Sequence, residues 1–306
     1  MQLDSVFDAM VVETAPFSVC ELSPRGWMAM PQSQMTSLHY VLSGKGTLHI
    51  AGRAPAKIEA GDLVLVPVGL SHTLAASDGG YISLANGGPV ALGLQHHKPI
   101  TDSDSAHGSG LVVLCAHVTL GLHGAGPVIE LLRKPLVDAR GESNVAARAI
   151  GLIIDELRQP GLGSGVMIRT LLLQCIVDAL RRRVAADDEA VSWILALSDR
   201  RLWPALSAIL EAPGAPHTVE GLAERVGMSR SRFAERFQRS FSSSPMEVVR
   251  GLRLQYAARL LLESDAGIAR IAERAGYSSR SHFTQQFESF FGKPPGKYRK
   301  NAAMVE

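Results

Sequence analysis

One sequence pattern occurs twice near the end of the chain. It consists of three phenylalanines spaced four residues apart and a proline four residues further on, and its second copy follows at an offset of 50 residues. Phenylalanines at this spacing lie on one face of a helix. The two copies are Phe233, Phe237, Phe241, Pro245 and Phe283, Phe287, Phe291, Pro295. Because such self-similarity is rare by chance, the pattern predicts one helical unit built twice.

Each copy is preceded by residues that predict a shorter helix and a turn. The shorter helix ends at Gly227 in the first copy and at Gly276 in the second, and glycine suits the left-handed conformation that follows a helix. Ser229 is expected to cap the next helix, and Ser278 or Ser279 takes this place in the second copy. This order predicts two helix-turn-helix units, whose second helices enter the DNA major groove.

The charge distribution favours nucleic acid as the partner. Residues 200–306 contain 17 Lys and Arg against 10 Asp and Glu, whereas residues 1–199 contain 14 against 19. A basic domain attached to an acidic one is typical of DNA-binding proteins. A helical bundle with a merely solvated charged face is the alternative, and two copies of the motif weigh against it. A continuous helix expected over Met246–Leu262 would fix the relative orientation of the two units.

Residues of about 202–300 resemble the DNA-binding domain of the AraC/XylS family of transcriptional regulators. The segments that carry the resemblance are Thr218–Ala223, Gly227–Phe233, Leu252–Leu261, Ile268–Ala272, Gly276–Phe283 and Phe287–Arg299. The resemblance implies a sequence-specific regulator, expected to be an activator, that binds double-stranded promoter DNA as a homodimer and works with RNA polymerase. It implies no catalytic residue and no cofactor.

The resemblance also assigns roles in DNA binding. Base contacts fall to Ser231, Ala234 and Glu235 in the first recognition helix, and to Arg280, Ser281 and Gln285 in the second, with Thr284 on the same polar face. Contacts to backbone phosphates fall to Arg230, Arg236, Arg239 and Lys297. Glu235 departs from the family, in which many members have a basic or amide residue, and its carboxylate repels phosphate. The second helix is therefore expected to be the stronger reader of base sequence.

The front of the chain contains short β-prone runs separated by turns. The expected strands are Leu38–Leu42, Gly46–Ile50, Asp62–Pro67, Tyr81–Leu84 and Leu111–Val118, with turns at Ser43–Gly46 and Ala60–Asp62. Short strands at this spacing predict an antiparallel barrel or sandwich. Two helical patterns follow, Val145–Leu157 and Val166–Val184, whose apolar stripes either pair with a second copy of the chain or pack onto the barrel.

These patterns together predict a multi-domain α+β protein with a cupin-like antiparallel β-barrel, a helical hairpin and an all-α C-terminal domain. An effector or sensor domain is expected at residues 1–125, a dimerisation or connector region at 126–186, a linker at 187–201 and the DNA-binding domain at 202–301. The sequence contains no run of about eighteen apolar residues and no signal-peptide pattern, so neither a membrane span nor export is expected. Three scattered cysteines fit a reducing cytoplasm.

The term cupin-like depends on one spacing. Gly61, Pro67, Gly69 and His72 resemble the second half of the cupin signature, and Leu38–Gly46 resembles the end of its first half. The resemblance implies a small β-barrel that holds an unknown small-molecule effector.

The ligand residues of metal-binding cupins are not matched. Gln32–Met35 fill the region of the two family histidines, and His39 stands where the family has a glutamate. Since two histidines rarely hold a metal alone, no metal is expected, and Trp27, His39 and His72 are expected to line an effector pocket. Structural histidines are one alternative, and a metal-dependent cupin enzyme fused to a DNA-binding module is another.

Two cysteines provide a second candidate signal. Cys20 and Cys115 lie in places comparable with oxidant-sensing cysteines of some relatives, so the resemblance implies either a small-molecule or a redox signal. Buried, unreactive thiols are the alternative, because reactivity needs a lowered pKa and access. Cys175 lies on an apolar helical stripe and is expected in the core.

Overall fold

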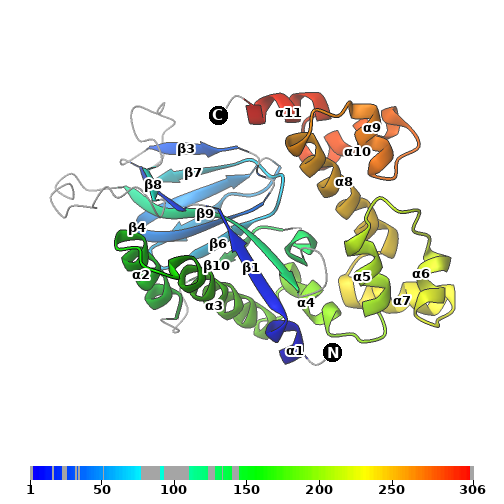
Figure 1. Cartoon of the computed structure of the whole chain (residues 1–306), viewed down its shortest axis with the longest axis horizontal. Helices are drawn as coiled ribbons and strands as arrows, with labels where there is room; N and C mark the ends of the chain where they lie inside the picture. Colours follow the sequence, from blue (N-terminus) through cyan, green and yellow to red (C-terminus); the bar gives the residue numbers. More distant parts are fainter. Residues whose placement is uncertain are drawn as a thin grey trace. The chain divides into compact units, whose positions relative to one another are not determined.

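The computed structural model of the 306-residue chain contains two compact units (Figure 1). It describes residues 3–15, 17–22, 26–31, 33, 35–50, 52–76, 90–92, 110–122, 128–132, 134–139 and 145–303. The sheet unit comprises Val12–Thr119 and Lys134–Arg182, and the helical unit comprises Met1–Val11, Leu120–Arg133 and Arg183–Glu306. Neither unit is contiguous in sequence, a feature that the domain boundaries expected from the sequence did not include. Those boundaries stay a prediction.

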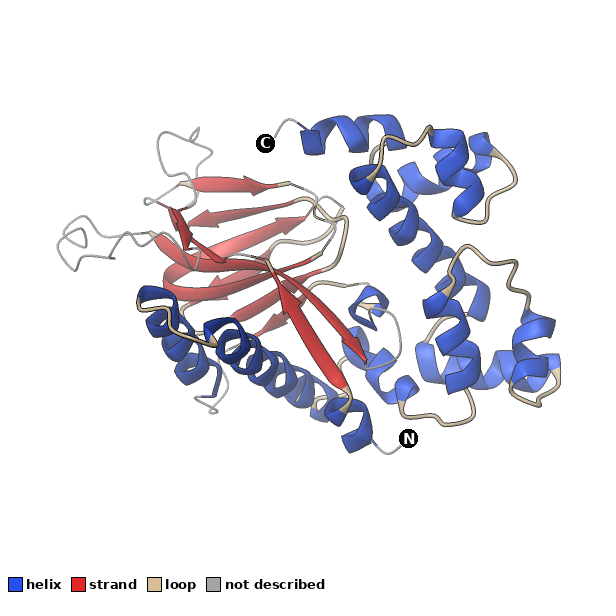
Figure 2. Ribbon diagram, viewed as in Figure 1, coloured by secondary structure: helices blue, strands red, loops and turns tan. Residues whose placement is uncertain are grey.

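The sheet unit is built on a curled antiparallel sheet, which forms a half-barrel (Figure 2). The main hydrogen-bonded path runs in the order β10-β6-β4-β9-β2-β8, and β1, β3, β5 and β7 pair beside it. The strands are β1 (Met10–Thr14), β2 (Phe17–Leu22), β3 (Trp27–Met30), β4 (Thr36–Ile50), β5 (Ala56–Glu59), β6 (Leu63–Val66), β7 (His72–Ala76), β8 (Val90–Leu92), β9 (Leu111–Leu122) and β10 (Leu136–Asp138).

The long strand β4 joins the two layers of the half-barrel. Its first part pairs with β6 and β9, and its part after Gly44 pairs with β5 and β7. Gly44 has a φ of 84°, and a Cβ atom there would lie 2.3 Å from the carbonyl oxygen of Gly110. The turn expected at Ser43–Gly46 is therefore wrong. The chain bends there within one strand, because glycine permits both the positive φ and the close approach.

Two helices of the sheet unit cover one face of the sheet, α2 (Val145–Arg158) and α3 (Ser164–Ala185) (Figure 1). Ile168 and Leu172 of α3 are buried, and Arg182 forms an ion pair with Asp138 of β10. The apolar stripe expected for these helices is thus packed within their own unit. The remaining exposed apolar side chains are the basis of the dimer proposal below.

The helical unit is dominated by two three-helix groups joined by one long helix. Its elements are α1 (Leu3–Asp8), the short helices η2 (Val128–Leu131) and η3 (Glu189–Val191), α4 (Ser192–Leu197), α5 (Trp203–Glu211), α6 (Val219–Arg225), α7 (Arg230–Phe241), α8 (Pro245–Glu263), α9 (Ile268–Arg274), α10 (Arg280–Phe291) and α11 (Pro295–Ala303). Figure 1 shows α5–α7 at one end of α8 and α9–α11 at the other. The continuous helix expected between the two copies is confirmed. The strand expected at Tyr81–Leu84 lies outside the described residues.

Candidate functional site

The first helix-turn-helix unit consists of α6 and α7. Thr218 caps α6 by accepting a hydrogen bond from the backbone N–H of Gly221, and Gly227 after the helix has a φ of 64°. Ser229 caps α7 by accepting from the N–H of Arg232. Both the glycine and the serine therefore do what the sequence predicts, and they set the direction in which α7 leaves the turn.

The second unit, α9 and α10, repeats this construction. Gly276 has a φ of 79°, and Ser279 accepts a hydrogen bond from the N–H of His282. Of the two serines that could cap this helix, the structure thus selects Ser279. A Cβ atom at Gly276 would lie 2.6 Å from the carbonyl oxygen of Gly214, so this turn requires glycine for space as well as for its φ.

The repeated phenylalanines form two matching ladders in the core. The ring centroids of Phe233 and Phe237 are 5.6 Å apart, and those of Phe283 and Phe287 are 5.5 Å apart. All four rings are fully buried. Because these rings occupy one face of α7 and one face of α10, the opposite faces are left to solvent and to a ligand.

The polar face of α10 is open. Arg280, Ser281 and Gln285 are exposed and Thr284 is half-buried. Within the described part of the chain, Arg280 forms no ion pair. Arginine and glutamine can each make paired hydrogen bonds to base edges, to guanine and adenine respectively. Lys297, on α11, is also exposed. The chemistry of this face suits base recognition in the major groove.

The polar face of α7 carries more internal charge pairing. Ser231 and Glu235 are exposed and Ala234 is half-buried. Arg239 lies 3.6 Å from Glu235 on the same helix, and Arg230 lies 2.9 Å from Glu220 of α6. Both pairs are exposed, so each contributes little to stability. They place carboxylates beside two of the arginines expected to contact phosphate.

Arg236 has a different environment from the other candidates. Its Nε lies 2.6 Å and its Nη2 3.0 Å from the two carboxylate oxygens of Asp199, which precedes α5. The Arg236 side chain is 34% exposed and that of Asp199 14%. A paired contact of this geometry anchors the recognition helix to the rest of its group. Its expected role in phosphate binding stays a prediction.

Two further arginines stabilise the motif, and neither was expected from the sequence. Arg253 donates to the carbonyl oxygens of Pro213 and Ala215 ahead of α6, and Arg299 donates to those of Leu261 and Ala266 ahead of α9. Each guanidinium thus holds the loop that leads into a helix-turn-helix unit. No local sequence signal indicates these bonds, because the accepting carbonyl groups lie 33 to 40 positions away in the chain.

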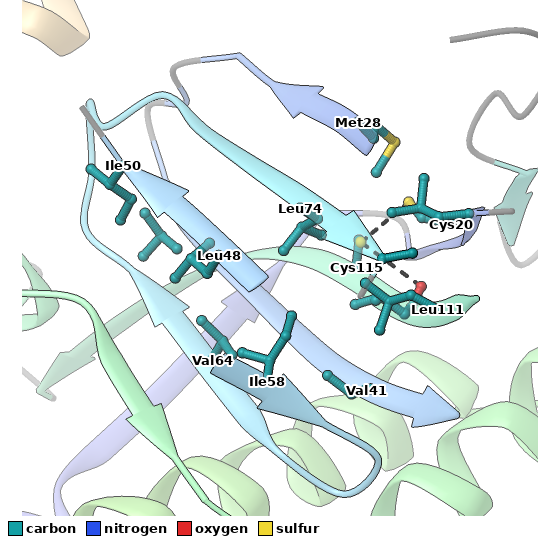
Figure 3. Close-up of a cluster of buried hydrophobic side chains, with 14 residues drawn as sticks. Cys20, Met28, Val41, Leu48, Ile50, Ile58, Val64, Leu74, Leu111 and Cys115 are labelled. Atoms are coloured by element: carbon teal, nitrogen blue, oxygen red, sulfur yellow. Dashed lines mark hydrogen bonds between the residues drawn. The ribbon is translucent and has the colours of Figure 1, made fainter. Parts of the chain in front are cut away.

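Four buried side chains in the sheet unit form a connected series, here called the thiol–imidazole cluster: Cys20, Cys115, His39 and His72. The Cys20 and Cys115 sulfurs lie 3.2 Å apart and point toward one another in the core (Figure 3). The Cys115 sulfur is 3.2 Å from His39 Nδ1, and His39 Nε2 is 2.7 Å from His72 Nε2. The strands β2, β9, β4 and β7 each contribute one member.

A backbone carbonyl sets the direction of the hydrogen bonds. His72 Nδ1 lies 3.3 Å from the carbonyl oxygen of Leu70, which can only accept, so Nδ1 carries the proton and Nε2 of the neutral ring accepts. His39 Nε2 must then donate to His72, which leaves His39 Nδ1 as an acceptor facing Cys115. The single Cys115 proton therefore has three acceptors within reach: the Cys20 sulfur, His39 Nδ1 and, at 3.8 Å, the carbonyl oxygen of Val113.

The cluster is electrostatically asymmetric. The hydrogen bond from Cys115 lowers the pKa of Cys20, whereas the same bond and burial raise the pKa of Cys115 well above its usual value. Burial lowers the pKa of His39 and brings that of His72 to about 4. Both imidazoles are thus neutral near pH 7, and Cys20 is the first thiol of the pair to ionise.

The expected effector residues are only partly brought together. His39 and His72 are in contact, but Trp27 pairs with Ala75 across β3 and β7 while His72 pairs with Met30. Since side chains alternate along a strand, Trp27 and His72 face opposite sides of the sheet. A shared pocket of Trp27 with the two histidines is therefore not formed, and a role in effector binding stays a prediction.

A metal centre at the cluster does not fit the donor geometry. The Nε2 atoms of His39 and His72 are directed at each other in a hydrogen bond. Among the residues that the structure describes, no group of three or more His, Cys, Asp and Glu is arranged to hold a metal ion. The described helices also include none long and apolar enough to span a membrane.

Comparison with known proteins identifies the class. The chain matches the cupin family over residues 2–185 and the helix-turn-helix domain family over residues 222–301. With its paired recognition helices, it is a DNA-binding transcriptional regulator with an N-terminal cupin domain. The chain belongs to the AraC/XylS family of transcriptional regulators.

Individual relatives match either the whole chain or its C-terminal part. The transcriptional regulator AlkR of Acinetobacter baylyi is 26% identical over 310 residues, which cover 98% of this chain and 99% of AlkR. The DNA-binding domain of AdpA, solved with a target DNA, is 30% identical with a TM-score of 0.34 and covers 35% of this chain and 96% of that domain. ToxT of Vibrio cholerae O395 is 11% identical with a TM-score of 0.47 and covers 96% and 98% of the two chains.

Proposed function

We propose that this regulator is controlled by a small oxidant, which converts Cys20 and Cys115 to a disulfide and thereby changes its affinity for DNA. The observation that carries the proposal is the 3.2 Å separation of the two sulfurs. A disulfide bond is about 2.05 Å long, so the sulfurs need to approach by about 1 Å. Since both thiols are almost fully buried, the oxidant must be small enough to enter the core.

The positions of Cys20 and Cys115 on their strands indicate that a disulfide between them would shift β2 and β9. Cys20 is paired with Val113 and Cys115 with Ser18, so the sulfurs meet diagonally across β2 and β9. Diagonal neighbours have Cα atoms about 7–8 Å apart, further than the usual disulfide range. Closing the bond therefore requires these strands to shift. The chain passes from the sheet unit to the helical unit within β9, so a shift of this strand provides a covalent route to the DNA-binding part.

DNA binding with and without oxidant tests the proposal. Affinity for a selected operator is measured at fixed salt before and after hydrogen peroxide treatment, for the full chain and for Cys20→Ser, Cys115→Ser and Cys175→Ser. We expect a change of about tenfold or more in the unsubstituted chain and in Cys175→Ser, which equals about 1.4 kcal/mol or more of differential binding. The other two variants should not respond. An equal response of Cys20→Ser would contradict the proposal.

We also propose that the chain acts as a homodimer through the outer face of α2 and α3. Leu152, Val166 and Met167 are 56%, 59% and 54% exposed, whereas Ile168 and Leu172 are buried within the unit. A dimer would present four recognition helices to a repeated operator. We further propose that the regulator activates transcription together with RNA polymerase, is located in the cytoplasm and has no enzymatic activity.

A further inference from the structure

We propose that His39 is the base that accepts the proton of Cys115 when the Cys20–Cys115 disulfide closes, and that His72 receives the charge from it. This inference rests on the oxidant response proposed above. It assigns different roles to the two cysteines: Cys20 is oxidised first, and Cys115 closes the bond.

The chemistry separates into two steps when the oxidant is a hydroperoxide. In the first, the Cys20 thiolate attacks a peroxide oxygen; an S–O bond forms, the O–O bond breaks, and hydroxide leaves. Cys20 is oxidised by two electrons to a sulfenic acid, and the peroxide is reduced. In the second step Cys115 attacks the Cys20 sulfur; the S–S bond forms, the S–O bond breaks, and the departing hydroxide takes up a proton and leaves as water.

The second step needs a base, because Cys115 holds its proton at neutral pH. The thiolate is the attacking species in disulfide chemistry, and the hydrogen bond to Cys20, together with burial, raises the pKa of Cys115. Before oxidation the Cys115 proton can stabilise the Cys20 thiolate. Once Cys20 is a sulfenic acid that negative charge is gone. Of the two acceptors that then remain, the Val113 carbonyl oxygen is too weak a base to take the proton, whereas the neutral His39 Nδ1, 3.2 Å from the Cys115 sulfur, can do so.

His72 can accept the positive charge that His39 gains with the proton of Cys115. When His39 Nδ1 gains a proton, its Nε2 proton can pass to His72 Nε2 over the 2.7 Å hydrogen bond. His72 would then be an imidazolium. Burial disfavours this charged form and brings the pKa of His72 to about 4, and the hydrogen bond from its Nδ1–H to the Leu70 carbonyl offsets part of that effect, so His72 holds the charge only briefly. After the hydroxide has taken up a proton, the two rings return to their neutral state.

The test compares His39→Gln with His117→Gln, which removes a neighbouring histidine of β9 that is outside the cluster. The full chain is mixed rapidly with hydrogen peroxide. Sulfenic acid is trapped with dimedone, and disulfide is counted by mass spectrometry of quenched samples. For His39→Gln we expect sulfenic acid to form at a rate within about twofold of the unsubstituted chain and to accumulate, while disulfide formation slows by about 10²–10⁴-fold, the usual contribution of a general base. His117→Gln should form disulfide at the normal rate.

Equal rates of disulfide formation in His39→Gln and the unsubstituted chain would overturn the role of His39. The absence of any disulfide in the unsubstituted chain would instead overturn the oxidant response itself, so the two failures are distinguishable.

The unsubstituted chain provides a readout that does not depend on how a variant folds. Around His39 the described titratable groups are Cys20, His72, Cys115 and His117, on β2, β7 and β9. With a neutral imidazole as base, the rate of disulfide closure should be flat between about pH 7 and about pH 9, whereas solvent hydroxide as base predicts a tenfold rise per pH unit. Such a rise would contradict the inference.

Discussion

Arg236 of the first recognition helix and Asp199 ahead of α5 form a two-point ion pair, with Nε–Oδ2 and Nη2–Oδ1 distances of 2.6 and 3.0 Å. The second recognition helix has no corresponding bond among the described residues: the position 50 residues on is Gln286, which has no charge. The two helix-turn-helix units thus share their phenylalanine core but differ in how the recognition helix is held. Arg236, which the family resemblance assigns to phosphate contact, thus binds Asp199 and stabilises the fold.

We expect Arg236→Gln to lower the free energy of unfolding by about 1–2 kcal/mol, a figure discounted because the arginine is about one third exposed to water. Urea unfolding at pH 7 measures the change, and Asp199→Asn is the matched variant. The slope of DNA affinity against salt should be unchanged in Arg236→Gln. A slope reduced by about one would show that Arg236 contacts a phosphate instead.

The same ion pair predicts a pH dependence. Burial raises the pKa of Asp199, but hydrogen bonds from Arg236 and from the Arg201 backbone outweigh it and leave this pKa below its usual value. Because the folded-state pKa is depressed, the contribution of the pair is fully present above the unfolded value of about 3.9 and is lost as the pH falls through the folded pKa. The stability difference between the unsubstituted chain and Asp199→Asn should therefore shrink below about pH 4. A difference that stays constant down to about pH 2 would argue against the pair.

Arg280→Ala and Arg239→Ala should affect DNA binding in different ways. Loss of Arg280 should cost about 1–3 kcal/mol on the preferred operator and little on random DNA, because a base-edge contact discriminates between sequences. Loss of Arg239 should weaken binding to both by a similar factor and reduce the salt slope by about one. Selection of bound sequences and titrations at several salt concentrations measure both effects. Equal losses on operator and random DNA for Arg280→Ala would remove its role in specificity.

The two turn glycines allow a matched test of packing. Gly227 and Gly276 both have a positive φ, but a Cβ atom at Gly227 meets no atom within 4 Å, whereas one at Gly276 meets the Gly214 carbonyl at 2.6 Å. Gly227→Ala should cost about 1 kcal/mol for its backbone conformation alone, and Gly276→Ala clearly more. Thermal unfolding of both variants checks the order. Equal losses would mean that the contact with Gly214 relaxes without penalty.

The dimer proposal predicts that Val166→Asp and Met167→Asp yield monomers in sedimentation experiments. A charge at either exposed position should leave the unit folded, since neither side chain is in the core. Gln174→Asp, at an exposed uncharged position two turns further along α3, adds the same single charge and is the control. An unchanged mass for both apolar variants would reject this face as the interface.

The sequence predicted the helix-turn-helix units closely because their determinants are local. Phenylalanine spacing, a glycine after one helix and a serine before the next act over four residues or fewer, and α6, α7, α9 and α10 follow them. The front domain was predicted less closely. The turn expected at Ser43–Gly46 became the bend of a continuous strand, because pairing with β9 up to Gly44 and with β5 and β7 beyond it outweighs the local turn preference.

The amino-acid sequence alone determined that this chain carries two helix-turn-helix units on one repeated plan, and it predicts that the second recognition helix is the stronger reader of base sequence. Only the tertiary structure decided which distant residues meet. Cys20 and Cys115 are 95 positions apart and His39 and Cys115 are 76 apart, and strand register brings them into contact. Register depends on the pairing of whole strands and on the burial of one sheet face, so no local pattern reports it. The same reason applies to Arg236, whose partner Asp199 lies outside its own helix.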